Sequence, residues 1–245
     1  QPIAPVSIDA LLEVLKLAFP RGLLQDRSAR PEIRRWNWGD VSEREIICEA
    51  GLNYQLEPFH RQNMGFFPDM SSGRAWLRSC SEHKRVLNLF SYTCSFSVSA
   101  AKGGATGVVN VDMSWSALER GRINHELNDC RIKVDYLKLN ILKSWGRIQR
   151  KGPYDLIICD PPSQQRGRFF WERDYVKVLR RLKMMLNPKG QVLACLNAPK
   201  VSRKEFFTMV ESVGDWKSFE WLDVADEFEN ENKDHGLKLL TMSLE

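Results

Sequence analysis

From about residue 84 onward the sequence alternates between short apolar runs and longer amphipathic segments, and this constrains the fold more than any other feature. The apolar runs predict strands at 86–91, 108–112, 134–139, 155–160, 190–197, 217–224 and 237–243. The segments between them predict helices at 95–103, 114–129, 171–187 and 202–213. Strands that alternate with helices form a doubly wound, mostly parallel sheet with helices on both faces. We therefore expect an α/β fold that binds its ligands at the carboxyl ends of the strands.

The first part of the chain has a different pattern. Apolar residues recur at helical spacing from Ile8 to Phe19, which predicts a helix there. Residues 44–49 and 52–56 flank Ala50-Gly51 and predict a β-hairpin. We expect residues 1–60 to form a small α+β segment in front of a main domain at 61–245. Such an appendage could contact the substrate or RNA.

Composition limits the class of protein. The chain has 245 residues, 43% of them hydrophobic, which is enough for one full domain and a small appendage. Its longest apolar runs are shorter than the ~20 residues of a membrane-spanning helix. The six cysteines are scattered without C-x-x-C spacing, so we expect no metal site and a reduced, cytoplasmic location. The net charge of +5 is compatible both with a polyanionic partner and with an ordinary soluble surface.

The loop after the first strand of the sheet carries hydroxyl groups and a thiol. The chain has no G-x-G-x-x-G motif, which argues against a dinucleotide because a pyrophosphate needs close approach of the backbone. Side-chain and backbone donors in this loop suit a nucleoside without phosphates, although an ordinary strand-to-helix turn would also use such residues. The cofactor-binding candidates here are Phe90, Ser91, Tyr92, Thr93 and Cys94.

The next two strands end in polar side chains. Asp112 follows an apolar run, and Met113 and the predicted helix N-cap Ser114 come directly after it. A carboxylate in this place can accept hydrogen bonds from both hydroxyls of a ribose, or can be a solvated cap. Asn140 ends the third strand, where its amide can contact the edge of an adenine or simply form a turn. Asp112, Met113 and Asn140 are therefore further cofactor candidates.

The fourth strand ends in Asp160-Pro161-Pro162-Ser163, the most specific motif of the chain. Prolines have no N–H group, so their backbone offers only carbonyl acceptors on a rigid track. A carboxylate beside such a carbonyl can hold a planar, amine-bearing base edge against a methyl sulfonium. We expect Asp160, Pro161 and Pro162 to be catalytic, with Asp160 also beside the cofactor.

The loop at 164–171 mixes guanidinium groups with aromatic rings. These groups can stack on a base and contact phosphate, or the rings can pack beneath the following helix. The candidates for substrate binding are Ser163, Arg166, Arg168 and Phe169.

Together these strand ends have the order and spacing of a Rossmann-like class I S-adenosylmethionine-dependent methyltransferase. The runs 88–93, 111–114 and 155–162 resemble the bacterial large-subunit ribosomal RNA methyltransferases, most closely the 7-methylguanine-forming K/L type and more distantly the 5-methylcytosine-forming I type. Gly65-Phe66-Phe67-Pro68-Asp69 is similar to the start of the family's G-x-F-x-D-x-R segment, which walls the cofactor pocket. The resemblance implies S-adenosyl-L-methionine as cofactor, S-adenosyl-L-homocysteine as product and RNA as substrate. It adds Phe67 and Asp69 to the cofactor residues.

The chain departs from the family pattern at three positions. Cys94 stands where the family usually has glycine, and Asn140 replaces the usual aspartate. Ser71 stands where relatives carry arginine, although Arg74 is close enough in sequence to substitute for it.

The resemblance also bears on the atom that is methylated. Relatives that methylate a cytosine carbon need a cysteine nucleophile after the fifth strand, and the matching position here is Ala198. Transfer to a base nitrogen is therefore favoured over transfer to carbon. The alternatives are a methyltransferase for a small molecule or a protein, and a binding module that keeps the cofactor pocket without turnover. The relatives carry extra RNA-binding modules, so either such a module precedes this segment, or the arginine-rich residues 21–38 do its work, or the substrate differs.

Overall fold

The computed structural model describes residues 7–26, 34–60, 63–162, 164–165, 169–225, 228 and 234–244. The chain divides into two compact units. The first consists of Gln1–Ile47 and Gln55–Phe66, and the second of Cys48–Tyr54 and Phe67–Glu245.

The first unit contains the predicted helix α1 (Ile8–Ala18) and an antiparallel strand pair, β1 (Gly22–Asp26) and β2 (Arg34–Trp38). The sequence did not predict this pair. Gly22 lies directly under the Trp38 indole, since a Cβ added at Gly22 would lie 2.2 Å from the ring. The indole nitrogen donates a hydrogen bond to the Phe19 carbonyl at 3.0 Å. A glycine in β1 therefore lets the large ring of β2 pack flat against its neighbour.

The predicted hairpin is present as β3 (Glu45–Glu49) and β4 (Leu52–Leu56). Its two turn residues, Ala50 and Gly51, have positive φ angles of 49° and 76°. Such angles are typical of the two-residue turns that match the twist of antiparallel strands.

The second unit is built on a seven-stranded sheet with the order β12-β13-β11-β8-β5-β6-β7. Its strands are β5 (Arg85–Leu89), β6 (Gly107–Asp112), β7 (Lys133–Lys138), β8 (Tyr154–Cys159), β11 (Leu186–Leu196), β12 (Ser218–Leu222) and β13 (Lys238–Ser243). All neighbouring strands are parallel except β13, which is antiparallel to both β11 and β12. The expected mostly parallel α/β sheet is confirmed.

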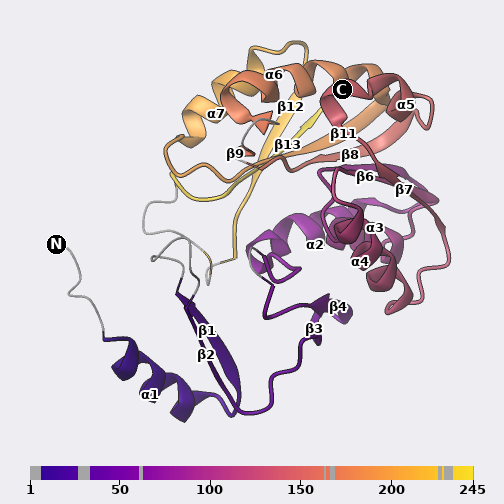
Figure 1. Cartoon of the computed structure of the whole chain (residues 1–245). Helices are drawn as coiled ribbons and strands as arrows, with labels where there is room; N and C mark the ends of the chain where they lie inside the picture. Colours follow the sequence, from indigo (N-terminus) through magenta and orange to yellow (C-terminus); the bar gives the residue numbers. More distant parts are fainter. Residues whose placement is uncertain are drawn as a thin grey trace. The chain divides into compact units, whose positions relative to one another are not determined.

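Helices cover both faces of this sheet. They are α2 (Ser71–Cys80), α3 (Ser95–Lys102), α4 (Trp115–Glu126), α5 (Trp145–Gln149), α6 (Trp171–Leu182) and α7 (Arg203–Glu211). Figure 1 shows α2, α3 and α4 on one face and α5, α6 and α7 on the other. The shorter elements are η1 (Pro68–Met70), η2 (Ile141–Lys143), η3 (Lys183–Met185) and the two-residue strands β9 (Gln164–Gln165) and β10 (Phe169–Phe170).

Alternating strand residues supply the two cores. In β5, Leu87 and Leu89 pack with α5, α6 and α7, whereas Val86 packs with α2 and α3. Both faces of β5 are therefore buried, as is typical of a parallel sheet covered on both sides. Asn88, the polar residue among them, donates a hydrogen bond to Asn110 Oδ1 at 3.0 Å. Burial of each apolar side chain contributes about 1.5–3 kcal/mol.

The order of the strands locates a crevice at one edge of the sheet. The chain runs from β5 outward to β6 and β7 and then returns to place β8 on the opposite side of β5. Ligands of open α/β sheets bind beyond the carboxyl ends of the strands at such a switch point. Here the switch point lies between β5 and β8, whose carboxyl ends lead to Phe90 and to Asp160.

Candidate active site

The loop from β5 to α3 has an unusual backbone. Phe90, Tyr92 and Cys94 have φ angles of 57°, 45° and 61°, in the left-handed region that residues other than glycine rarely adopt. Ser91 N–H donates to the Val111 carbonyl at 3.1 Å, and Cys94 N–H donates to the Ser91 carbonyl at 2.7 Å. Each left-handed residue costs of the order of 1–3 kcal/mol unless its surroundings hold it there. The hydrogen bonds to the end of β6 provide such support.

Asp112 joins this loop to the next strand. Its Oδ2 accepts the Tyr92 N–H at 2.9 Å, and its Oδ1 accepts the Ser114 N–H at 2.8 Å. These two bonds fix the carboxylate at the carboxyl end of β6. Because each carboxylate oxygen has two lone pairs, both oxygens can still accept a hydroxyl group. Met113, between Asp112 and Ser114 in the sequence, is partly buried.

Asn140 follows β7 on the same edge of the sheet. The backbone N–H of Leu139 donates to the Asp112 carbonyl at 2.9 Å, which brings the end of β7 beside the end of β6. Asn140 is partly buried and precedes η2, and its side chain makes no capping hydrogen bond to that short helix.

Aromatic rings line two sides of the β5–α3 loop. The Phe67 ring lies 5.6 Å from the Tyr92 ring, measured between centroids, and the Phe90 ring lies 5.2 Å from the Phe169 ring. Phe169 is buried at the start of β10 and belongs to the core cluster that includes residues of α6. This agrees with the second expectation for that loop, that its rings pack beneath the following helix. Phe67 is exposed, which leaves an accessible apolar surface beside Tyr92.

The Cys94 side chain and the Thr93 carbonyl both contact helix α4. A Cβ added at Gly121 of α4 would lie 2.3 Å from the Cys94 Sγ, so the thiol packs directly on that glycine. The Asn124 side chain donates to the Thr93 carbonyl at 2.9 Å. The cysteine that replaces the usual glycine is therefore accommodated by α4, and its thiol does not enter the crevice.

Asp160 and Asp69 form an acidic pair. Burial of the Asp160 carboxyl group, together with the nearby Asp69 carboxylate, raises the pKa of Asp160 to about 7, although the Arg74 guanidinium opposes this shift. Burial also raises the pKa of Asp69. Perturbed carboxyl groups of this kind are enriched in functional sites. Pro161 is buried and Pro162 is exposed directly after Asp160.

Two buried polar atoms support a ligand at this edge. Among the described residues, Asp69 Oδ1 and Ser91 Oγ are buried without a hydrogen-bond partner. Buried polar groups without partners are costly, and a polar ligand is one way to satisfy them. A cofactor that carries hydroxyl groups, an amine and a positive charge has donors for these two oxygens and for the remaining lone pairs of Asp112.

Arg74 and Glu49 belong to the same region but were not among the predicted site residues. Arg74 is buried in α2 and its charge acts on both Asp69 and Asp160. The sequence signal was the short spacing between Arg74 and Ser71, whereas nothing in the sequence indicated Glu49.

Three predicted substrate residues, Ser163, Arg166 and Arg168, lie outside the described residues. All the other predicted site residues lie at or beside the carboxyl ends of β5, β6, β7 and β8. Their roles are considered under the proposed function below.

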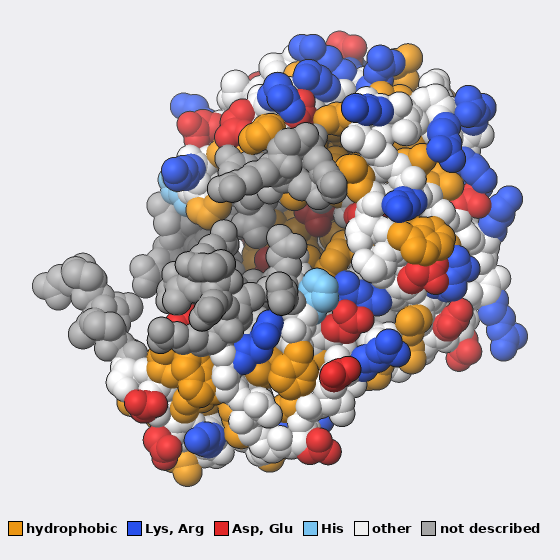
Figure 2. Space-filling view, viewed as in Figure 1, with side chains coloured by type: hydrophobic (Ala, Val, Ile, Leu, Met, Phe, Trp, Pro, Cys, Tyr) orange, Lys and Arg blue, Asp and Glu red, His pale blue; other side chains and the backbone are white. Residues whose placement is uncertain are grey.

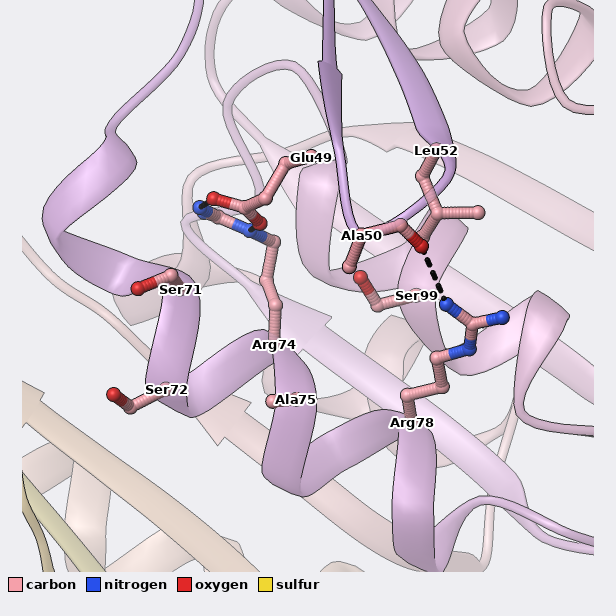
Figure 3. Close-up of a pocket in the computed structure, with 9 residues that line it drawn as sticks. All are labelled: Glu49, Ala50, Leu52, Ser71, Ser72, Arg74, Ala75, Arg78 and Ser99. Carbon is pink, nitrogen blue, oxygen red and sulfur yellow. Dashed lines mark hydrogen bonds and ion pairs between the residues drawn. The ribbon is translucent and has the colours of Figure 1, made fainter. Parts of the chain in front are cut away.

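A pocket of about 240 Å³ lies beside the Glu49–Arg74 pair, between the β3–β4 turn and α2 (Figure 3). It shares no residue with the predicted site and is lined by Glu49, Ala50, Leu52, Ser71, Ser72, Arg74, Ala75, Arg78 and Ser99.

Charge is spread over the surface. Figure 2 shows Lys and Arg side chains around the outer margin of the face in view, with Asp and Glu side chains between them. No helix in the described ranges is long and apolar enough to cross a membrane. Within those same ranges, no cluster of three or more His, Cys, Asp or Glu side chains could hold a metal ion.

Known proteins resemble the chain over most of its length. A family model for S-adenosylmethionine-dependent methyltransferases matches residues 18–243. The chain is 28% identical over 215 residues to Ribosomal RNA large subunit methyltransferase I of Escherichia coli O127:H6 (strain E2348/69 / EPEC), covering 82% of this chain and 54% of the relative. It is 35% identical over 164 residues to Ribosomal RNA large subunit methyltransferase K/L of Shewanella sp. (strain MR-4), covering 63% of this chain and 23% of the relative. The chain thus spans about half, or less, of the length of these relatives.

The structural comparison agrees. The crystal structure of SMU.776 in complex with SAH matches with a TM-score of 0.78 and 26% sequence identity, covering 86% of this chain and 58% of that chain. The fold, the strand-end residues and the nearly complete match to the family model lead to one conclusion: this chain belongs to the S-adenosylmethionine-dependent methyltransferase family.

Proposed function

We propose that this protein transfers a methyl group from S-adenosyl-L-methionine to a base nitrogen of RNA, and that the RNA is ribosomal. The observation that carries the proposal is Asp160-Pro161-Pro162 at the carboxyl end of β8, beside the switch point and next to Asp69. The names of the relatives support ribosomal RNA as the substrate class. Such a substrate would place the reaction in the cytoplasm.

The proposed cofactor residues surround the β5–α3 loop. Asp112 would hold the ribose hydroxyls, Met113 would lie beside the adenosine, and Asn140 would meet the adenine edge. Phe67 and Tyr92 would form an apolar wall, while Asp69 and the backbone of Phe90, Ser91, Thr93 and Cys94 would face the methionine part. When bound, the cofactor supplies an electrophilic methyl group on a sulfonium sulfur.

The proposed target residues hold the base. The Asp160 carboxylate would accept an N–H of the base, and the Pro161 carbonyl would accept a second one, because a proline offers an acceptor on a rigid backbone. The base nitrogen then forms its bond to the methyl carbon as the sulfur–carbon bond breaks, and the electron pair of that bond stays on sulfur. Where the nitrogen carries a hydrogen, its proton passes to the Asp160 carboxylate or to water. Alignment of the nitrogen lone pair can contribute several kcal/mol to lowering the barrier.

Two buried cysteines favour nitrogen over carbon as the acceptor. Cys159 and Cys195 lie in the strands that end at the site, and both thiols are completely buried. Burial raises the pKa of each thiol, and raises that of Cys195 well above its ordinary value. Neither can supply the thiolate that addition to a cytosine ring requires. Ala198, at the position that matches the family's nucleophile, has no thiol.

We also propose that the methyltransferase domain comprises 61–245 and that 1–60 is an appendage that contacts the substrate. Ser163, Arg166 and Arg168, which follow Asp160 in the sequence, are the proposed substrate contacts, whereas Phe169 is buried in the core and is not proposed as one. The arginines would contact phosphate, so binding of RNA should weaken as salt is raised.

The test is transfer of labelled methyl groups to bulk RNA by the wild-type protein and by Asp160→Asn. We expect the wild type to label RNA and the variant to lose most of this activity while still binding S-adenosyl-L-homocysteine. Glu211→Gln, an exposed position on α7, is the control and should leave transfer unchanged. Nucleoside mass spectrometry of the labelled RNA identifies the modified atom.

Other outcomes would contradict parts of the proposal. Labelling of protein or small molecules but not of RNA would exclude the proposed substrate. Cofactor binding without transfer to any pool would indicate a non-catalytic binding module. Labelling of carbon rather than nitrogen would contradict the argument from the buried thiols.

A further inference from the structure

Arg74 is the most buried cation described near the proposed site. Its residue surface is 2% exposed, although it lies on the helix that carries the exposed Arg78 one turn later. Arg74 Nε donates to Glu49 Oε2 and Arg74 Nη2 donates to Glu49 Oε1, each at 2.6 Å. Figure 3 shows the guanidinium facing the Glu49 carboxylate edge to edge. Such bidentate pairs fix the position of the guanidinium as well as its charge.

A third hydrogen bond connects this pair to the segment before α2. Arg74 Nη1 donates to the Phe67 carbonyl at 3.0 Å. The Phe67 ring in turn packs against the Tyr92 ring, with centroids 5.6 Å apart. The guanidinium therefore links the β3–β4 hairpin, through Glu49, to the segment Phe67–Asp69 and to the β5–α3 loop.

Arg74 also acts electrostatically on Asp69 and Asp160. Its charge opposes the rise of the pKa of both Asp69 and Asp160. The guanidinium thus pairs directly with Glu49, and its charge also reaches Asp69 and Asp160. One cation among three acids leaves the region net negative when they are ionised, which suits a positively charged ligand.

We propose that Arg74 is a positioning residue, held in place by Glu49, which fixes the Phe67–Asp69 segment as one wall of the cofactor site. The inference rests on the proposed function, because the wall has this role only if the cofactor binds there. It assigns a role to the Glu49–Arg74 pair, which is not part of the strand-end motifs. It also explains how the chain keeps an arginine near the site although position 71 is a serine.

The test compares Arg74→Gln, Arg74→Lys and Glu49→Gln with Arg78→Gln as a matched control. Arg78 lies on the same helix and donates to the carbonyl of Ala50 in the hairpin turn at 3.0 Å, whereas the Phe67 carbonyl accepts from Arg74. Calorimetry with S-adenosyl-L-homocysteine measures binding, and thermal unfolding measures stability in parallel. We expect Arg74→Gln to bind the nucleoside about tenfold more weakly or worse, since a hydrogen bond from a charged group is lost. Arg78→Gln should bind as the wild type does.

The conservative variants separate position from charge. Arg74→Lys keeps the charge, but an ammonium group cannot donate to the Glu49 carboxylate and the Phe67 carbonyl with the geometry of a guanidinium. It should therefore recover only part of the binding. Glu49→Gln keeps the guanidinium but releases its anchor, so binding should fall between that of the wild type and that of Arg74→Gln. These two variants also test the proposal if Arg74→Gln does not fold.

A pH profile of methyl transfer is a further test, because a purely structural role of Arg74 would leave the profile unchanged. The groups that interact electrostatically with Asp160 are Asp69 on η1, Arg74 on α2, Cys159 on β8, Tyr175 on α6 and Cys195 on β11. Among the described residues, Arg74 is the group that lowers the pKa of Asp160, so its removal should raise that pKa further. If transfer requires the ionised Asp160 carboxylate, the acidic limb of the pH profile should shift to higher pH in Arg74→Gln. In Arg78→Gln it should stay in place.

Two results are decisive. If the wild-type chain binds the nucleoside and all Arg74 and Glu49 variants bind it equally well, the positioning role is wrong and the proposed function stands. If the wild-type chain does not bind the nucleoside, the proposed function and this inference both fail.

Discussion

At the scale of single residues, Cys94 shows how a departure from a family pattern is accommodated. A side chain in the left-handed region at the start of α3 has little room, and here the thiol lies in the space that a Cβ at Gly121 would occupy. The sequence contained both residues, but they are far apart along the chain, and only the packing of α3 against α4 brings them together. The same holds for the pairing of Glu49 with Arg74. Contacts of this kind could not be predicted from motif spacing.

The complementarity of Cys94 and Gly121 can be tested by a double-mutant cycle. Gly121→Ala should destabilise the protein by about 1–3 kcal/mol, because the added methyl group overlaps the thiol. Cys94→Gly should relieve much of this loss, since it removes the thiol and places glycine at a positive φ angle. Urea denaturation gives the free energies of unfolding.

Gly146→Ala is the control for this cycle, because the nearest side-chain atom to a Cβ there is 3.9 Å away, in Arg150. It should be neutral or slightly stabilising, as alanine favours helix over glycine. Strictly additive effects of Gly121→Ala and Cys94→Gly would contradict the direct contact.

At the scale of secondary structure, apolar patterns predicted the elements of the sheet well. The strands and helices expected from residue 86 onward are all present, with their ends shifted by a few residues. The predicted helix 171–187 instead ends at Leu182, and η3 and the start of β11 follow. The prediction was wrong there because the apolar residues Met185 and Leu186 continue the helical spacing, although Met185 lies in the 3-10 helix η3 and Leu186 begins β11.

Other elements were missed for identifiable reasons. Helix α2 begins with Ser71, Ser72 and Gly73, which are poor helix formers without an apolar stripe. Strands β1 and β2 contain polar residues and are too short for a clear alternation. These three elements are stabilised by tertiary or cross-strand contacts, which intrinsic secondary-structure propensities do not include.

Helix α4 supports the β5–α3 loop through its carboxyl-terminal half, and this can be tested. Asn124→Ala removes the hydrogen bond to the Thr93 carbonyl and leaves that buried acceptor without this donor. We expect a loss of stability of about 1–3 kcal/mol and weaker binding of S-adenosyl-L-homocysteine. Denaturation and calorimetry measure the two effects.

Asn128→Ala is the matched control. Asn128 lies just after α4 and accepts the Asn53 N–H at 2.8 Å. It donates to the carbonyls of Asn53 and Asn124, each at 2.7 Å, so it ties the end of α4 to β4 rather than to the β5–α3 loop. Its loss should lower stability with little change in binding. Equal loss of binding in both variants would argue against a specific role for Asn124.

At the scale of the whole molecule, the order of the strands determines where chemistry can occur. The motifs at the ends of β5, β6, β7 and β8 were predicted to converge because carboxyl ends of parallel strands share one edge of a sheet, and the described residues do lie there. Fold class and family could therefore be predicted from the sequence. The identity of the substrate could not, because its proposed contacts Arg166 and Arg168 belong to a loop whose composition suits several partners.

The central claim is that this edge of the sheet forms a site for the adenosine and methionine parts of the cofactor. Titration calorimetry of the chain with S-adenosyl-L-homocysteine tests it most directly. We expect saturable binding of one molecule per chain, greatly weakened by Asp112→Ala and unaffected by Glu211→Gln. An absence of binding to the wild-type chain, by both S-adenosyl-L-homocysteine and S-adenosyl-L-methionine, would contradict the claim.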